Sequence, residues 1–392
     1  MLRLLALSSS LLLLACTAGA DALCDLSSPR PPPGSKCASA WQDENLRVND
    51  LTSLGTHNSY KRAIPGKELA LLHSRSPGAA TSLDYAHRPI EQQLQFGARQ
   101  LELDIHIDKD GKRFANPLAA RLTATPLEAD FEAEMAQPGF KVMHVPDIDF
   151  RSNCLSFIAC LQIIRTWSEA NPDHTPLLIL INAKDDPSPV PGGASVEKFS
   201  TADFDALDAE IASVFAAYRL ITPDEVRGSH PTLRTAVLAG NWPRLRDARG
   251  RILFALDDNP EKVALYQGER HSLGGRLMFV NTDESSPAAA YLTLNDPIRE
   301  AQRIRAAVDA GFLVRTRADA DTVEARSGST SRRDAALSSG AQYISTDYMQ
   351  PDARFSSYSV QLPADAVSIC NPVRTRERCS GQTIVEPMQR RQ

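Results

Sequence analysis

Short apolar runs alternate with longer amphipathic stretches along most of the chain. Eight of these runs have the length of buried strands, over residues 49–54, 99–107, 141–144, 176–181, 251–256, 277–280, 312–315 and 342–345. Helical periodicity occurs over residues 89–96, 157–170, 201–218, 297–310 and 331–339. Strands that alternate with helices predict parallel β-α-β units.

Eight predicted strands fit one closed barrel, so the pattern predicts an α/β fold with a TIM-like (β/α)8 barrel. We expect a single catalytic domain over residues 46–380. A doubly wound open sheet is the competing architecture. It is disfavoured because no Gly-rich phosphate-binding loop follows the first predicted strand.

The two ends of the chain differ from this pattern. Residues 1–20 have the layout of an export signal, with Arg3 before a leucine-rich stretch that is too short to span a bilayer. The sequence before Cys16 also resembles the lipobox of bacterial lipoproteins, so the alternatives are cleavage after Ala20 and a lipid anchor on Cys16. Both predict a secreted, periplasmic or lipid-anchored protein. We expect residues 21–45 to form a Pro-rich tether and residues 381–392 a flexible tail.

Outside the signal, six cysteines remain, and an even number in an exported chain indicates disulfides. Six cysteines allow 15 pairings, of which the simplest joins sequence neighbours: Cys24–Cys37, Cys154–Cys160 and Cys370–Cys379. A zinc site is the rival interpretation. It is disfavoured because the chain has no Cys-x2-Cys pair with accompanying histidines.

Composition narrows the class of partner. The chain is 42% hydrophobic and 23% charged, with a net charge of −5, as expected for a soluble globular protein. Basic residues cluster only at Arg332-Arg333 and over residues 374–378, which disfavours nucleic acid as a partner. No stretch after residue 20 is apolar enough for a transmembrane span, and we expect a monomer.

Polar residues gather where the predicted strands end, which is where barrel enzymes carry their active sites. Glu102 and Asp104 lie two apart on the second strand, so both side chains point to the same face. Two neighbouring carboxylates repel each other unless a cation lies between them, and Ca²⁺ or Mg²⁺ prefers such oxygen ligands. Asn58 and Asn182 can add amide oxygens. The alternative is that the carboxylates form ion pairs with Arg99 or with a lysine of a neighbouring strand.

His57 and His144 follow the strands on either side of this acidic pair. Two histidines near a metal suit phosphoryl transfer, because one can stabilise the transition-state charge while the other protonates the leaving oxygen. Lys184 is a candidate for phosphate contact, or else an exposed strand-end lysine, and Arg315 and Arg317 are weaker candidates. The remaining histidines lack such a context, although His106 shares the inward parity: they are His73, His87, His106, His174, His230 and His271.

Together, Thr56-His57-Asn58-Ser59-Tyr60, Leu101-Glu102-Leu103-Asp104 and His144 resemble the calcium-dependent phosphoinositide-specific phospholipase C superfamily. The layout is that of its single-domain secreted bacterial members, and the match is clearest over residues 51–186. The resemblance implies that His57 stabilises the transition state and that His144 protonates the departing diacylglycerol oxygen. Asn58, Glu102 and Asp104 would be calcium ligands. The substrate would be a phosphoinositide at a membrane surface, cleaved by attack of its own 2-hydroxyl to a cyclic inositol phosphate.

One position departs from the family. Asn182 occupies the place where members commonly carry a glutamate ligand, and an amide brings no charge and cannot act as a base. The base role would then fall to Glu102 or Asp104, and fewer anionic ligands predict weaker calcium binding.

Two rival functions remain open. A glycerophosphodiester phosphodiesterase shares the barrel, the histidine pair and a Glu-x-Lys that Asn182-Ala183-Lys184 resembles, but usually carries His-Arg-Gly where this chain has His57-Asn58-Ser59. A non-catalytic lipoprotein that binds phosphate or glycans is the rival of another class.

Overall fold

The computed structural model describes residues 24–386, so the expected export signal and Cys16 lie outside it. Eight parallel strands form a nearly closed barrel in the order β6-β5-β4-β2-β1-β9-β8-β7. Between β6 and β7 only a single parallel bridge, Asn281 to Tyr291, joins the edges. The barrel strands are β1 (Leu51–Thr56), β2 (Gln100–Asp108), β4 (Leu177–Ala183), β5 (Ile252–Leu256), β6 (Met278–Val280), β7 (Tyr291–Thr293), β8 (Leu313–Arg317) and β9 (Tyr343–Thr346).

Helices cover the outside of the barrel, so its strands are buried on both faces. Among them are α4 (Ile90–Gln95), α7 (Phe157–Ala170), α8 (Thr201–Val214), α12 (Pro260–Gln267), α13 (Ala301–Ala310) and α15 (Ser331–Ser338). In α7, the Ser156 side chain caps the first turn, and the buried face carries residues such as Phe157, Leu161 and Ile164. Short helices α9 (Pro223–Arg227), α10 (Leu233–Leu238), α11 (Leu245–Ala248) and α14 (Val323–Ser327) complete the outer layer.

The predicted barrel is confirmed, but one of its expected strands is wrong. The run at 141–144 becomes β3 (Gly139–Val142), which pairs antiparallel with the end of β2, from Ile105 to Asp108, and lies outside the barrel. The cause is the length of β2, because this nine-residue strand continues beyond its parallel partners and its free end requires a partner. The eighth strand is instead β7, whose three residues include the polar Thr293 and so form no continuous apolar run.

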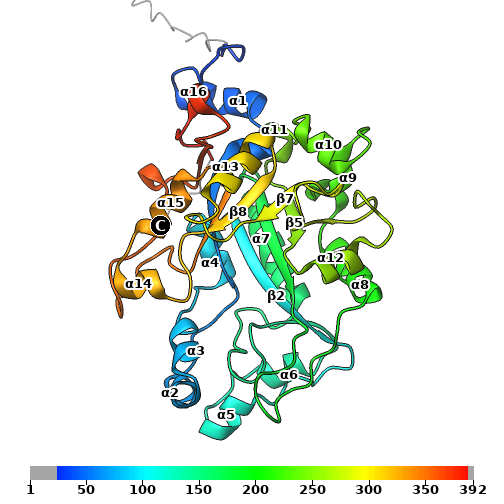
Figure 1. Cartoon of the computed structure of the whole chain (residues 1–392), viewed down its shortest axis with the longest axis vertical. Helices are drawn as coiled ribbons and strands as arrows, with labels where there is room; N and C mark the ends of the chain where they lie inside the picture. The colour runs from blue at the N-terminus through cyan, green and yellow to red at the C-terminus, as the bar shows by residue number, and fades with distance from the viewer. Residues whose placement is uncertain (1–23, 387–392) are drawn as a thin grey trace, which may run out of the picture.

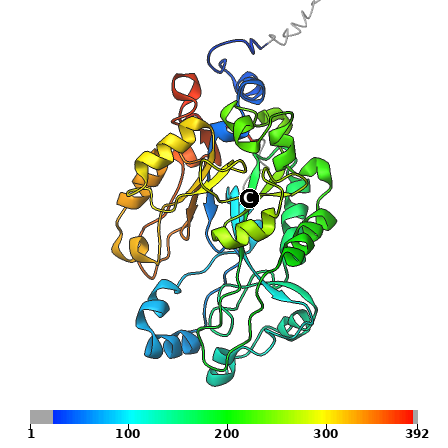
Figure 2. The ribbon, with the colours of Figure 1, turned by 45° about the vertical axis from the view of Figure 1, so that its right-hand side comes forward.

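Different helices and strands cover the two ends of the barrel. Beyond the carboxyl ends of the strands lie α2 (Gly66–Arg75), α3 (Pro77–Ser82), α5 (Leu118–Thr123) and α6 (Phe131–Met135), at the bottom of Figures 1 and 2. At the opposite end lie α1 (Ser35–Asn45) and α16 (Arg376–Cys379) (Figure 1), while β10 (Ser368–Cys370) pairs antiparallel with the start of β1.

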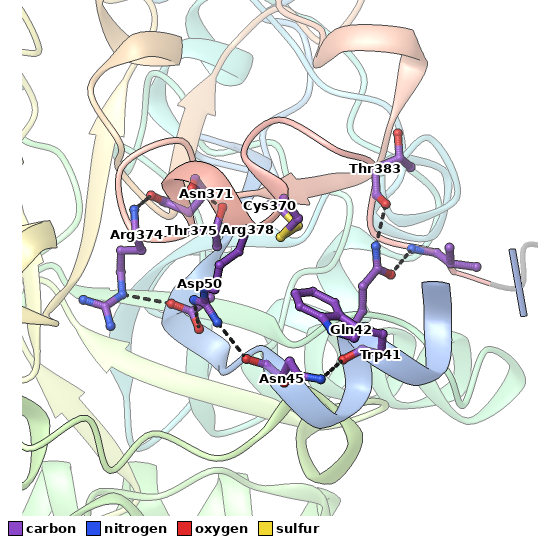
Figure 3. Close-up of a disulfide and its surroundings, with 12 residues drawn as sticks. Trp41, Gln42, Asn45, Asp50, Cys370, Asn371, Arg374, Thr375, Arg378 and Thr383 are labelled. Atoms are coloured by element: carbon purple, nitrogen blue, oxygen red, sulfur yellow. Dashed lines mark hydrogen bonds and ion pairs between the residues drawn. A yellow bond between two sulfur atoms is a disulfide. The ribbon is translucent and has the colours of Figure 1, made fainter. Parts of the chain in front are cut away.

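The segments at this opposite end were expected to be loose, over residues 21–45 and from residue 381 onward. Their described parts instead pack against the barrel. Trp41 of α1 is 1% exposed and packs with Leu51, Cys370 and Ile384. Gln42 donates to the Thr383 carbonyl at 2.9 Å (Figure 3). The expected tether is therefore helical over residues 35–45. Residues 381–386 are held to the barrel by this apolar cluster, by the Gln42 hydrogen bond and by the ion pair of Glu386 with Arg99.

All three expected disulfides are confirmed: Cys24–Cys37, Cys154–Cys160 and Cys370–Cys379. In the described residues, no helix has both the length and the apolar character needed to cross a bilayer.

Candidate active site

The predicted site residues meet at the carboxyl end of the barrel. His57 and Asn58 directly follow β1, and Asn58 takes a left-handed φ of 48°, which asparagine tolerates better than most residues. Asp104 of β2 is in register with Asn182 of β4, so the two strands bring the acidic pair and the amide side by side. Lys184 is the first residue after β4.

Glu102 is a buried carboxylate with several partners. Its Oε2 accepts a hydrogen bond from Arg315 Nη2 at 2.6 Å, and its Oε1 accepts one from Asn182 Nδ2 at 3.3 Å. Oε1 also lies 3.9 Å from His57 Nε2. Burial alone would raise the pKa of Glu102, but the Arg315 and His57 charges outweigh it and hold this pKa below its usual value. Glu102 is therefore ionised.

Asp104 is buried more completely and has fewer partners. Lys184 Nζ lies 3.2 Å from its Oδ2, yet neither carboxylate oxygen accepts a well-aligned hydrogen bond from the described residues. The ion pair with a neighbouring strand's lysine, expected as the alternative to a metal, is therefore present. Arg99 does not take part, since it pairs with Glu386 at the other end of the barrel.

The donor chemistry of this cluster fits a hard divalent cation. Asn58, Glu102, Asp104 and Asn182 offer carboxylate and carboxamide oxygens, which Ca²⁺ prefers. The specific observation in favour is that neither buried Asp104 oxygen accepts a well-aligned hydrogen bond from the described residues, although Lys184 lies 3.2 Å away. The set has only two carboxylates, and no cluster of three or more His, Cys, Asp or Glu side chains arranged for a metal occurs within residues 24–386.

His57 forms a dyad with Asp347, which directly follows β9. Nδ1 donates to Asp347 Oδ1 at 3.1 Å, so Nε2 faces the cluster, 3.4 Å from Arg317 Nη1. Burial and then the Arg317 charge lower the pKa of His57, while Asp347 and Glu102 act in the opposite direction. Burial would raise the pKa of Asp347, but His57, His87 and Arg317 hold it well below the usual range.

His144 forms a second dyad with Asp149. Nδ1 donates to Asp149 Oδ2 at 2.8 Å, and the other carboxylate oxygen accepts from the fully buried Lys61 at 2.8 Å. Burial would raise the pKa of Asp149, but the Lys61 ammonium and the His144 hydrogen bond lower it overall. His144 lies in the loop after β3, not at the end of a barrel strand. This loop is joined to the acidic strand because the Met143 amide donates to the Asp104 carbonyl at 3.3 Å.

The two candidate arginines differ in whether their guanidinium groups are free to contact a phosphate. Arg315 is committed to Glu102, Asn295 and Ser345 and is 1% exposed, so it serves the carboxylate cluster and is not a free phosphate contact. Arg317 instead lies beside His57 Nε2.

The histidine with inward parity, His106, has a packing role. Its ring contacts Phe114, its Nε2 donates to the Met143 carbonyl, and burial lowers its pKa to about 3.

Several residues at this site were not singled out from the sequence. Two of them had a usable signal as polar residues near the end of a predicted strand, because Asp257 directly follows residues 251–256 and Asp347 lies two residues after residues 342–345. Burial raises the pKa of Asp257 to about 6, against the lowering effect of Arg315. Asp149 and Tyr85 lie in irregular segments, where no periodicity indicates which side chains turn toward the site.

Comparison with known proteins gives one family match. The family described as "Phosphoinositide phospholipase C, Ca2+-dependent" matches residues 46–372. No curated protein matches the chain.

Among solved structures, the calcium-dependent phosphoinositol-specific phospholipase C of a Pseudomonas species, in a myoinositol complex, has a TM-score of 0.48 at 16% identity, covering 78% of this chain and 91% of that one. The Streptomyces antibioticus Ca²⁺-dependent phosphatidylinositol-specific enzyme has a TM-score of 0.46 at 19% identity, covering 77% and 95%. The phosphatidylinositol-specific phospholipase C of Listeria monocytogenes has a TM-score of 0.44 at 12% identity, covering 81% and 93%.

Proposed function

Because this chain belongs to the family of Ca²⁺-dependent phosphoinositide phospholipases C, we propose that it cleaves phosphatidylinositol to diacylglycerol and a cyclic inositol phosphate. The observation that carries the proposal is the pair of His–carboxylate dyads, His57–Asp347 and His144–Asp149, beside the oxygen cluster of Glu102. Such an arrangement supplies both an electrostatic stabiliser and a proton donor for phosphodiester cleavage.

The metal would be held by Asn58, Glu102, Asp104 and Asn182. When bound, Ca²⁺ would supply positive charge that acidifies the inositol 2-hydroxyl and offsets the phosphate charge. Asn182 cannot accept a proton. Since Glu102 is held by Arg315, we assign the base role to Asp104, whose oxygens have no well-aligned hydrogen bond.

His57 and Arg317 would act together on the phosphoryl group. Their nitrogens are 3.4 Å apart, so one phosphoryl oxygen can accept hydrogen bonds from both. Asp347 holds the ring by Nδ1 and stabilises its protonated form, in which Nε2 donates to the oxygen.

His144 would be the general acid. Asp149 fixes its Nδ1, so Nε2 carries the proton that passes to the departing diacylglycerol oxygen. Asp149 thereby orients the ring toward the leaving group, and Lys61 holds the carboxylate in place.

We place the substrate at a membrane surface and the enzyme outside the cytosol, on the grounds of the expected export signal and the three disulfides. Calcium is proposed as the cofactor, with Mg²⁺ as the alternative to be tested.

The identity of the products tests the proposal. Phosphatidylinositol vesicles incubated with the purified protein and Ca²⁺ should yield a cyclic inositol phosphate, detected by phosphorus NMR. Glycerol phosphate released from deacylated diesters would instead favour the rival glycerophosphodiester phosphodiesterase. Release of neither product would favour a protein that only binds phosphate or glycans.

A further inference from the structure

An irregular segment between α3 and α4 contacts both His57 and Asn58. We call residues 85–87 the strap. Tyr85 is 4% exposed and the His87 side chain is 5% exposed, so both are buried against the end of β1. Neither residue stands out in the sequence, and the proposed reaction assigns no role to them.

The Tyr85 hydroxyl touches the two residues at the same time. Asn58 Nδ2 donates to it at 2.9 Å, and His57 Nδ1 lies 3.2 Å away. The Tyr85 and His57 rings are stacked with centroids 6.1 Å apart, and Lys61 Nζ lies 4.9 Å from the Tyr85 centroid on the ring face. The hydroxyl is therefore held by surrounding side chains and cannot move freely.

His87 fixes the backbone of the same turn. Its Nε2 donates to the His57 carbonyl at 2.7 Å and lies 3.7 Å from Asp347 Oδ1. Its own amide donates to the Lys61 carbonyl at 2.9 Å, which secures the strap against the loop after β1. The strap therefore contacts the ring of His57 through Tyr85 and the main chain of His57 through His87.

The contact with Asn58 decides which end of its carboxamide faces the acidic cluster. Because Nδ2 donates to Tyr85, Oδ1 points away from the strap, where the Tyr60 hydroxyl approaches it at 3.4 Å. A flipped amide would present a donor to the cluster and could not serve as an oxygen ligand. Partners that orient ligand side chains commonly contribute 10–100-fold to metal affinity or activity.

We infer that Tyr85 is a positioning residue that sets the Asn58 carboxamide as an oxygen donor and the His57 ring as a phosphoryl contact through one hydroxyl. The inference rests on the proposed function, since it assigns these two partners their roles. It predicts that loss of the hydroxyl weakens cation binding and the chemical step together, while substrate binding is largely kept.

The test is Tyr85→Phe, with Tyr348→Phe as its matched control. Tyr348 is also buried, but its hydroxyl has no hydrogen-bond partner among the described residues. Isothermal titration with Ca²⁺ alone measures binding without turnover, and assays on phosphatidylinositol vesicles give kcat and KM. We expect Tyr85→Phe to lose about 10-fold in Ca²⁺ affinity and about 10-fold in kcat, with KM within about 2-fold of the wild type. Tyr348→Phe should change each value by less than about 2-fold.

Wild-type values for Tyr85→Phe, or equal losses in both variants, would overturn the inference while leaving the proposed function intact. If the wild type itself neither binds Ca²⁺ nor cleaves the lipid, the proposed function fails first. Crystal structures then decide the positioning role, since Asn58 and His57 side chains that keep their places in Tyr85→Phe contradict it and rotated ones support it.

Discussion

Arg315→Met tests whether Arg315 and a bound cation both neutralise the Glu102 carboxylate. The Arg315 and Glu102 side chains are 2% and 6% exposed, and their closest atoms are 2.6 Å apart. Removing one partner of such a buried pair leaves an uncompensated charge and typically costs 3–5 kcal/mol. Asn182 still donates to Glu102, so we expect the lower end of this range, about 3 kcal/mol. For a chain of this size that corresponds to a Tm lower by about 4 °C.

Calcium should reverse part of this loss. A cation that binds the folded state adds about 2.7 kcal/mol of stability at a concentration 100 times its Kd. In Arg315→Met the cation meets a Glu102 that has lost its hydrogen-bonded guanidinium, so it should bind more tightly than in the wild type. Thermal unfolding in EGTA and in saturating Ca²⁺ would therefore show a larger Ca²⁺-induced rise in Tm for the variant.

Arg276→Met is the matched control. Arg276 is also buried and pairs with Asp205 and Asp208, at the start of β6 and away from the oxygen cluster. This variant should lose stability without any extra response to Ca²⁺. The reasoning is refuted if Arg315→Met is as stable as the wild type in EGTA, or if Ca²⁺ raises the Tm of both arginine variants equally.

Three further predictions concern single side chains. His144→Ala should lower kcat on phosphatidylinositol vesicles at least about 10²-fold, and an unchanged rate would remove the proposed acid. Asp347→Asn removes a charge that raises the pKa of His57, so this pKa should fall further and the basic limb of the kcat/KM profile should move to lower pH; an unmoved limb contradicts the dyad. Glu386 has its pKa lowered to about 2 from 4.5 by Arg99 and Thr175 in spite of burial, so its ionised form stabilises the fold above pH 4.5. Glu386→Gln should thus cost roughly 3 kcal/mol at pH 7, measured by urea unfolding, and this difference should shrink as pH falls from 4.5 toward 2.

The sequence was sufficient to predict the barrel. Its strands are buried on both faces and therefore stand out as apolar runs. It also predicted the acidic pair, since residues two apart on a strand share a face whatever the partner strands are. It could not predict that 141–144 pairs antiparallel, because pairing direction depends on how far β2 extends beyond its neighbours. It also missed β7, because this strand has three residues of which one is the polar Thr293.

The sequence singled out candidate ligands and histidines that lie near one another in the structure, but not the residues that hold them in place. Asp149 is five residues after His144 in an irregular loop, and its pairing with Lys61 joins segments 88 residues apart. The commitment of Arg315 to Glu102 joins β2 and β8, which are not neighbours in the sheet. Such contacts depend on the closed shape of the barrel, and no local feature of the sequence encodes them.

The central claim is that cleavage depends on a cation held by the oxygen cluster of Glu102 and Asp104 between the two dyads. The most direct measurement is the initial rate of phosphatidylinositol cleavage as a function of free Ca²⁺, set with EGTA buffers, for the wild type and for Asp104→Asn. We expect no turnover in EGTA, a saturable rise with Ca²⁺ in the wild type, and in Asp104→Asn a rise displaced to higher Ca²⁺ with a lower plateau. A full rate in EGTA, or an Asp104→Asn curve that overlays the wild type, would contradict the account.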